Sequence, residues 1–269
     1  MSALRLTDVT TVLFDADGNL FPSEPVALQA SAPVTDRLAK ALGLTERFTP
    51  ESLRVATTGR NFRSLASEFS AGGGRWSEPV RRLTDEELER WVEEENRVVS
   101  EYLRLHLQPD AAVVDAVTRI ADAFSVAVVS ASSIWRLQAC FSATGLASFF
   151  PPHLCFSAED SLPTPVSKPN PAIYLEALKR LGLRPEQGVA IEDSVRGVQA
   201  AVAAGCPTIG NLAFVEADDR GTLAAELRAA GASAVVETWA EAVDLLEQQQ
   251  PVGALAGPSH DVAETQEHR

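Results

Sequence analysis

The sequence has few cysteines, no long apolar run and no leader-like N-terminus. Its three cysteines, Cys140, Cys155 and Cys206, lie far apart and form no C-x-x-C pair. This excludes a disulfide framework and favours a reducing compartment, with all three as small buried hydrophobic residues. No apolar run reaches the roughly 18 residues of a membrane-spanning helix, and the first residues lack a signal-peptide pattern. We therefore expect a cytoplasmic protein.

Positive charge is also scarce. The chain has 23 Lys and Arg residues against 37 Asp and Glu residues, which gives a formal net charge of -14 and a pI near 4.7. Such a surface repels nucleic-acid phosphates and anionic lipids, so we expect no nucleic-acid or membrane partner. A site for an anionic substrate would have to be made locally positive, by a metal ion or by Lys and Arg side chains.

Six short apolar segments predict strands at 10–15, 125–130, 153–158, 188–193, 207–211 and 233–237. Helical patterns lie between the later ones, at 166–182, 194–205 and 218–231. This alternation predicts an α/β fold with a Rossmann-like, doubly wound parallel sheet. Ligands of such folds bind at the carboxyl ends of the strands.

Residues 22–107 differ, because they show helical patterns and no strand pattern. A capping box, Thr84 followed by Glu87, begins the last of these helices. We interpret 22–107 as a helical cap domain inserted into a catalytic core of residues 1–21 and 108–247. Residues 248–269 contain few large apolar side chains, and we expect a disordered tail.

Acidic residues end two of the predicted strands. Asp15 and Asp17 precede Gly18, which permits a turn between strand and cap. Glu192 and Asp193 end the strand at 188–193, where two uncompensated acids are costly to bury. Magnesium bound by Asp15 and Asp193, with Glu192 in support, would remove that cost. A simple turn or helix cap remains the alternative for each acidic pair.

Two further polar features follow predicted strands. Ser130 ends the segment at 125–130, and its hydroxyl, with the backbone N–H groups that begin at Ala131, would form an anion site. An ordinary helix N-cap is the alternative for Ser130. Lys168 lies in the sequence SKPNP, where prolines restrict the backbone and would hold the ammonium group against a phosphoryl oxygen or a carboxylate.

At these residues the chain resembles the haloacid dehalogenase superfamily, in the branch of phosphatases and β-phosphoglucomutases that has a helical cap after the first strand. The resemblance covers roughly residues 9–247. It is carried by FDADGNL, VVSASS, SKPNPAIYLEAL and VAIEDSVRGVQAA, in that order.

This resemblance implies phosphoryl transfer through an aspartyl-phosphate. Asp15 would be the nucleophile and Asp17 the general acid and base. Ser130, Ala131 and Lys168 would bind the transferring phosphoryl group, with Lys168 bridging it to Asp15. The substrate would be a small phosphorylated metabolite, of which a sugar phosphate is our preferred candidate.

The resemblance also implies Mg²⁺ as the cofactor. Asp15, Asp193 and the backbone carbonyl of Asp17 would bind the ion, and Glu192 would contribute through water. Dehalogenating relatives lack the second acid of the first motif, so the presence of Asp17 disfavours halide displacement.

Two departures from the family pattern and two arginines of the cap decide the remaining expectations. Asn19 stands where relatives commonly have Thr or Val, and Ala27 replaces a cap-entry His of the phosphoglucomutase type. The missing His favours a phosphatase over a phosphomutase, which stays the alternative, and a non-catalytic binding protein is the second alternative. In the cap, Arg60 or Arg63 would recognise a second anionic group of the substrate, unless both are surface arginines. We expect a monomer or a weak homodimer.

Overall fold

A computed structural model describes residues 7–57 and 61–248 of the chain. The core of this fold is a six-stranded sheet in which every neighbouring pair of strands is parallel. The strands are β1 (Thr11–Phe14), β2 (Ser125–Ser130), β3 (Cys155–Ser157), β4 (Gly188–Glu192), β5 (Thr208–Asn211) and β6 (Ala234–Val236). Their spatial order is β3-β2-β1-β4-β5-β6. The predicted α/β fold with a doubly wound parallel sheet is therefore confirmed, and the strand order reverses at β1.

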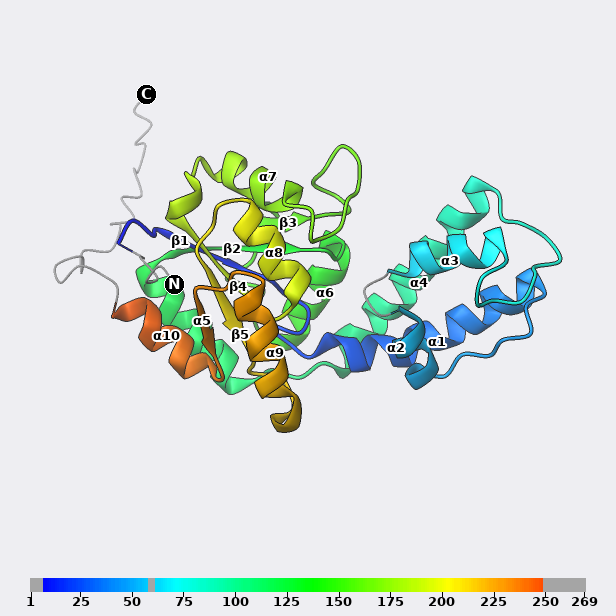
Figure 1. Cartoon of the computed structure of the whole chain (residues 1–269), viewed down its shortest axis with the longest axis horizontal. Helices are drawn as coiled ribbons and strands as arrows, with labels where there is room; N and C mark the ends of the chain where they lie inside the picture. Colours follow the sequence, from blue (N-terminus) through cyan, green and yellow to red (C-terminus); the bar gives the residue numbers. More distant parts are fainter. Residues whose placement is uncertain (1–6, 58–60, 249–269) are drawn as a thin grey trace, which may run out of the picture.

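Helices cover both faces of this sheet (Figure 1). They are α5 (Ala111–Ala123), α6 (Ile134–Thr144), α7 (Ala172–Leu181), α8 (Val195–Ala203), α9 (Ala217–Ala229) and α10 (Trp239–Glu247), with short 3₁₀ turns η1 (Pro152–Leu154) and η2 (Pro185–Gln187). Successive side chains of β1 point to opposite faces. Val12 and Phe14 pack with α5, α6 and α10, whereas Leu13 packs with α7 and α8. Both faces of the central strand are thus buried, which explains its continuous apolar run.

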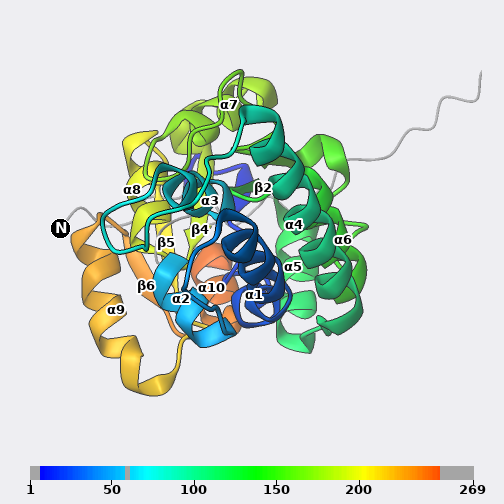
Figure 2. The same cartoon turned by 90° about the vertical axis from the view of Figure 1, so that its right-hand side faces the viewer.

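Four helices separate β1 from α5: α1 (Ser23–Leu42), α2 (Pro50–Thr57), α3 (Phe62–Ala71) and α4 (Asp85–His106). They form a second body beside the sheet (Figures 1 and 2). Its separate core includes Leu38, Leu65, Phe69 and Val92. The capping box at Thr84 is confirmed, because its side chain accepts a hydrogen bond from the Glu87 N–H and the Glu87 side chain bonds back.

The last turns of α4 join this second body to the sheet. Val99 and Leu103 of α4 are fully buried and belong to the same apolar cluster as β1 and α6. Among the described residues, no helix has the length and apolar character needed to cross a membrane. The carboxyl ends of β1, β2 and β4 meet beside α1 and α4, and this edge carries the polar residues considered next.

Candidate active site

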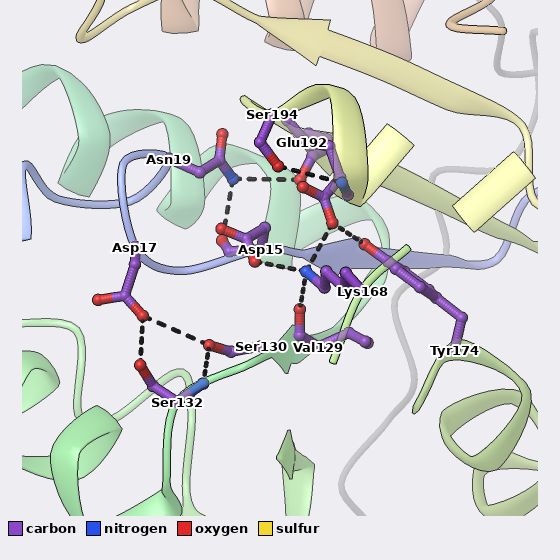
Figure 3. A network of polar contacts seen from close by, with 12 residues as sticks. Asp15, Asp17, Asn19, Val129, Ser130, Ser132, Lys168, Tyr174, Glu192 and Ser194 are labelled. Atoms are coloured by element: carbon purple, nitrogen blue, oxygen red, sulfur yellow. Dashed lines mark hydrogen bonds and ion pairs between the residues drawn. The ribbon is translucent and has the colours of Figure 1, made fainter. Parts of the chain in front are cut away.

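Lys168 connects the carboxylates at the ends of β1 and β4 (Figure 3). Its Nζ atom lies 2.5 Å from Asp15 Oδ1 and 2.6 Å from Glu192 Oε1, and it donates to the Val129 carbonyl at 2.9 Å. Lys168 is only 6% exposed and Glu192 is fully buried. The predicted contact of this lysine with a carboxylate is present, and the role of the neighbouring prolines in holding it stays a prediction.

Asp17 lies in the loop after β1, just before the turn at Gly18, and its side chain is directed away from Lys168 (Figure 3). Gly18 has a φ of 82° and its N–H donates to the Phe21 carbonyl at 2.9 Å. The Asp17 carboxylate accepts hydrogen bonds from Ser132 Oγ at 2.7 Å and from Ser23 Oγ at 2.5 Å. Asp17 does not cap α1, whose N-cap is Pro22. The two acids of the first motif therefore have separate surroundings, Asp15 with a lysine and Asp17 with hydroxyl groups.

Ser130 lies at the carboxyl end of β2, facing Asp17 across the site. Its hydroxyl accepts from the Ser132 N–H at 3.0 Å and lies 3.5 Å from Asp17 Oδ2. Helix α6 is capped by Ser133, not by Ser130, so the alternative interpretation of Ser130 as an N-cap is wrong. Ser130 and Ala131 line the same cavity as Asp15 and Lys168, where they are available to an oxyanion.

Asp15, Glu192 and Asp193 form an acidic cluster with the geometry of a cation site. One carboxylate oxygen from each lies within 4.8 Å of the others. The competing interpretation of Asp193 as a helix cap is wrong, because Ser194 caps α8 by accepting from the Gly197 N–H at 3.1 Å. Figure 3 shows Asp15 and Glu192 of this cluster close together, where the neighbouring strands β1 and β4 end.

The electrostatics of this cluster fit a divalent cation. Burial, and then the charge of Glu192, raise the pKa of Asp193 to about 7. Burial raises the pKa of Asp15 well above its usual value, although Lys168 opposes the shift. One lysine thus faces three carboxylates, and Glu192 Oε2 is a buried oxygen without a hydrogen-bond partner in the described part of the chain. Hard oxygen ligands with surplus negative charge are what Mg²⁺ prefers.

Gly18 leaves room beside this cluster. A Cβ atom at this position would lie 2.3 Å from Asp193 Oδ2. Any side chain here would press on that carboxylate, and the positive φ disfavours one as well. The glycine of the first motif therefore serves both the turn and the approach of Asp193.

A pair of buried amides, which the sequence did not indicate, links three strand ends. Asn19 donates to the carbonyls of Asp15 at 2.9 Å and Ile191 at 3.2 Å, and accepts from Asn211 Nδ2 at 2.9 Å. Asn19 and Asn211 are 0% and 1% exposed. The departure at Asn19 thus has a structural role, since its side chain fastens the loop after β1 to β4. Its partner at the end of β5 carries no motif that would have revealed it.

The cavity above these groups has a volume of about 450 Å³ and lies between the sheet edge and the helices α1 to α4. Leu28, Leu53, Phe62 and Val92 form an apolar part of its wall. Arg63 also lines it, but its guanidinium group bonds to both carboxylate oxygens of Glu89. Arg60, the other predicted substrate contact, lies outside the described residues.

Sequence reasoning also missed a polar cluster in the wall of this cavity. It consists of Ser31, Glu95, Asn96 and Arg136, which interact with one another. None belongs to one of the four motifs, and Glu95 lies in an acid-rich helix that resembles a solvated surface. The only available signal was the spacing of apolar residues in α4, which places Glu95 on the same face as Val92 and Val99.

Comparison with known proteins agrees with this architecture. The sequence model of the haloacid dehalogenase-like hydrolase family matches residues 9–205. A stretch of 50 residues is 50% identical to the plasmid-encoded protein CbbY of Cupriavidus necator, but it spans only 19% of this chain and 20% of that protein.

Solved structures extend the likeness to the whole fold. CbbY from Rhodobacter sphaeroides, solved as a mutant in complex with xylulose-(1,5)bisphosphate, has a TM-score of 0.65 at 22% identity, covering 87% of this chain and 96% of that one. A putative β-phosphoglucomutase from Thermotoga maritima has a TM-score of 0.61 at 23% identity, covering 89% and 99%.

A parallel α/β sheet with acidic groups and a lysine at its carboxyl edge is the arrangement of an enzyme active site. The family match covers well over half of the chain. This chain belongs to the haloacid dehalogenase-like hydrolase family.

Proposed function

We propose that this chain is a magnesium-dependent phosphatase that hydrolyses a small phosphorylated metabolite, with a sugar phosphate as the favoured candidate. The phosphoryl group would pass through a covalent aspartyl-phosphate on Asp15. The observation that carries this proposal is the bridge from Lys168 to Asp15, with Glu192 and Asp193 alongside. A carboxylate held by an ammonium group beside a cation site is arranged to attack an anionic phosphorus centre.

In the first step, a carboxylate oxygen of Asp15 attacks phosphorus while the bond to the leaving oxygen breaks. Lys168 neutralises a phosphoryl oxygen, and Ser130 with the N–H of Ala131 binds the others. Asp17, as the carboxylic acid, gives its proton to the leaving oxygen. The hydrogen bonds from Ser23 and Ser132 keep the Asp17 carboxyl directed into the cavity.

In the second step, water attacks phosphorus of the aspartyl-phosphate. Asp17, now ionised, removes a proton from this water, and the bond from phosphorus to Asp15 breaks to release inorganic phosphate. Asp15 regains its carboxylate and Asp17 its proton, so the cycle closes. The same acid thus serves both steps.

Asp15, Asp193 and the backbone carbonyl of Asp17 would hold the magnesium ion, with Glu192 contributing through water. When bound, Mg²⁺ supplies positive charge to the phosphoryl oxygens and orients them for in-line displacement. Glu192 is already engaged by Lys168 and by the Tyr174 hydroxyl at 2.6 Å. These contacts support a role for Glu192 in the outer coordination sphere of the ion, where it would act through a water molecule.

Helices α1 to α4, within residues 22–107, would act as a cap that closes over the bound substrate and excludes bulk water. Ala27 lines the cavity where a phosphoglucomutase-type relative has a His. A small apolar side chain there gives no group to align a second sugar hydroxyl with Asp17. Water is therefore the preferred acceptor of the phosphoryl group.

The test is a panel of phosphorylated metabolites assayed with Mg²⁺ and with EDTA, measuring free phosphate and isomerised product separately. We expect magnesium-dependent phosphate release that is lost in Asp15→Asn. Isomer formation without free phosphate would make the protein a phosphomutase. Undiminished hydrolysis by Asp15→Asn would refute the mechanism, and no turnover of any ester would leave only a binding protein on this fold.

A further inference from the structure

One part of the cavity wall is formed by the cluster of Ser31, Glu95, Asn96 and Arg136. Arg136 Nη2 donates to Glu95 Oε2 and to Asn96 Oδ1, each at 2.8 Å. Ser31 Oγ donates to Glu95 Oε1 at 2.8 Å. Ser31 and the α4 residues Glu95 and Asn96 come from the inserted helices, whereas Arg136 comes from α6 beside the sheet. The cluster therefore joins the two bodies across the cavity.

This cluster shares the cavity with the reacting groups. All four of its members line the same space as Asp15 and Asp17. Burial opposes the charge of Arg136, but Glu95, and then Asp17, raise the pKa of its guanidinium group above the usual value. Arg136 is close enough to Asp17 for their charges to interact, so a leaving group whose oxygen lies at Asp17 would come near this cluster.

The charges within the cluster are already balanced. Glu95 is 5% exposed, and the Arg136 side chain is 19% exposed. A second phosphate or a carboxylate on Arg136 would have to compete with Glu95, which would then be left as a buried carboxylate with only the Ser31 hydroxyl. Such an uncompensated buried charge is strongly unfavourable.

The other described cations that line the cavity also have ion-pair or hydrogen-bond partners. Lys168 is paired with Asp15 and Glu192, and Arg63 with Glu89. Arg196 donates from Nε and Nη2 to the Lys168 carbonyl. The described lining contains four cationic side chains and six acids, namely Asp15, Asp17, Glu24, Glu95, Glu159 and Asp193. A divalent ion at the acidic cluster would balance this excess, and it would leave no surplus of positive charge among the described lining residues.

The cluster instead offers hydrogen-bonding groups suited to neutral hydroxyls. Each oxygen of Glu95 can accept a further hydrogen bond, and the Asn96 amide adds donors. Adjacent donors and acceptors of this kind match the hydroxyl groups of a polyol, whereas Leu28, Phe62 and Val92 match its carbon faces.

We propose that the Glu95–Arg136 pair is a specificity device that selects phosphate monoesters with an uncharged, hydroxyl-rich leaving group and rejects bisphosphates. This inference rests on the proposed phosphatase function and narrows its substrate class. Glu95 is the discriminating residue, because its negative charge keeps Arg136 from binding a second anion. Arg136 in turn holds Glu95 in place for hydroxyl recognition.

The test compares hexose monophosphates with the corresponding bisphosphates, for example fructose 6-phosphate and fructose 1-phosphate with fructose 1,6-bisphosphate. The wild-type protein should show the higher kcat/KM on a monophosphate. Glu95→Gln keeps the shape and the hydrogen bond to Arg136 but removes the charge, so it should raise the bisphosphate-to-monophosphate ratio on the order of tenfold. Glu94→Gln is the matched control, because Glu94 lies next to it on α4 but pairs with Arg37 at the surface.

p-Nitrophenyl phosphate separates failure of this inference from failure of the proposed function, since it has no hydroxyls and no second anion. If p-nitrophenyl phosphate is hydrolysed but the wild type prefers the bisphosphates, or cleaves no hexose phosphate, the inference is overturned. An unchanged ratio in Glu95→Gln overturns it as well. If p-nitrophenyl phosphate and every sugar phosphate are left intact, the phosphatase function itself fails. The wild-type preference decides the matter even if Glu95→Gln does not fold.

Discussion

Replacing Lys168 by Met tests the electrostatic account of the site. Lys168 is the buried cation that contacts two of the three clustered carboxylates, at 2.5 Å and 2.6 Å. Removing one partner of a buried ion pair typically costs about 3 to 5 kcal/mol, because the other charge stays uncompensated. For a chain of this size, each kcal/mol lowers the melting temperature by about 2 to 4 °C. We therefore expect a large loss of stability in EDTA, with abolished turnover.

Magnesium should recover part of this loss, because the ion supplies positive charge to the same carboxylates. The assay is thermal unfolding followed by circular dichroism, with EDTA and then with saturating Mg²⁺. The matched control is Lys179→Met, whose side chain is 80% exposed and 4.0 Å from Glu176. That variant should change stability by less than about 0.5 kcal/mol. A Lys168→Met protein as stable in EDTA as the wild type would refute the reasoning.

Three further outcomes are expected. Asp193→Asn should raise the melting temperature in EDTA, because it removes one of the clustered buried negative charges. It should also abolish the stabilisation by Mg²⁺, which for the wild type is about 2.7 kcal/mol at a Mg²⁺ concentration of 100 times Kd. A magnesium response equal to that of the wild type would contradict this. Asn211→Leu should lower the free energy of unfolding, measured in urea, by about 1 to 3 kcal/mol, since the Asn19 amide loses a buried partner. It should also raise the Mg²⁺ concentration for half-maximal activity. Unchanged values of both would refute the role of the amide pair. Burial raises the thiol pKa of Cys155 to about 11 and of Cys206 to about 12, and it also raises the thiol pKa of Cys140. Ellman's reagent should therefore titrate three thiols in guanidinium and none in the native protein. A fast-reacting native thiol would contradict the described burial.

The α/β fold could be predicted from the sequence because the strands of the sheet are short and apolar on both faces. The run at 10–15 matches β1, and the acids that follow it mark the edge of the sheet where ligands bind. Asp15 and Asp193 could be predicted to meet, since parallel strands bring their carboxyl ends to one edge. Lys168 lies in the loop between β3 and α7, and its contact with a carboxylate was predicted from the adjacent prolines and from the family resemblance. Their distances and the direction of the Asp15 and Asp193 pKa shifts required the structure.

The parts that escaped prediction depend on contacts between distant segments. Glu95 and Arg136 are 41 residues apart, and Asn19 and Asn211 are 192 apart. No local pattern distinguishes them from surface or turn residues. Glu95 in particular lies among exposed acids of α4, and only the packing of that helix against α1 and α6 buries it.

The central claim is that Asp15 carries the phosphoryl group. The most direct measurement is an acid quench during turnover of a ³²P-labelled monoester, followed by peptide mapping. We predict a label that is stable in acid, is released by hydroxylamine, and lies on the peptide containing Asp15. Label on Ser130 or Asp17 instead, or full hydrolysis by Asp15→Asn, would contradict the account.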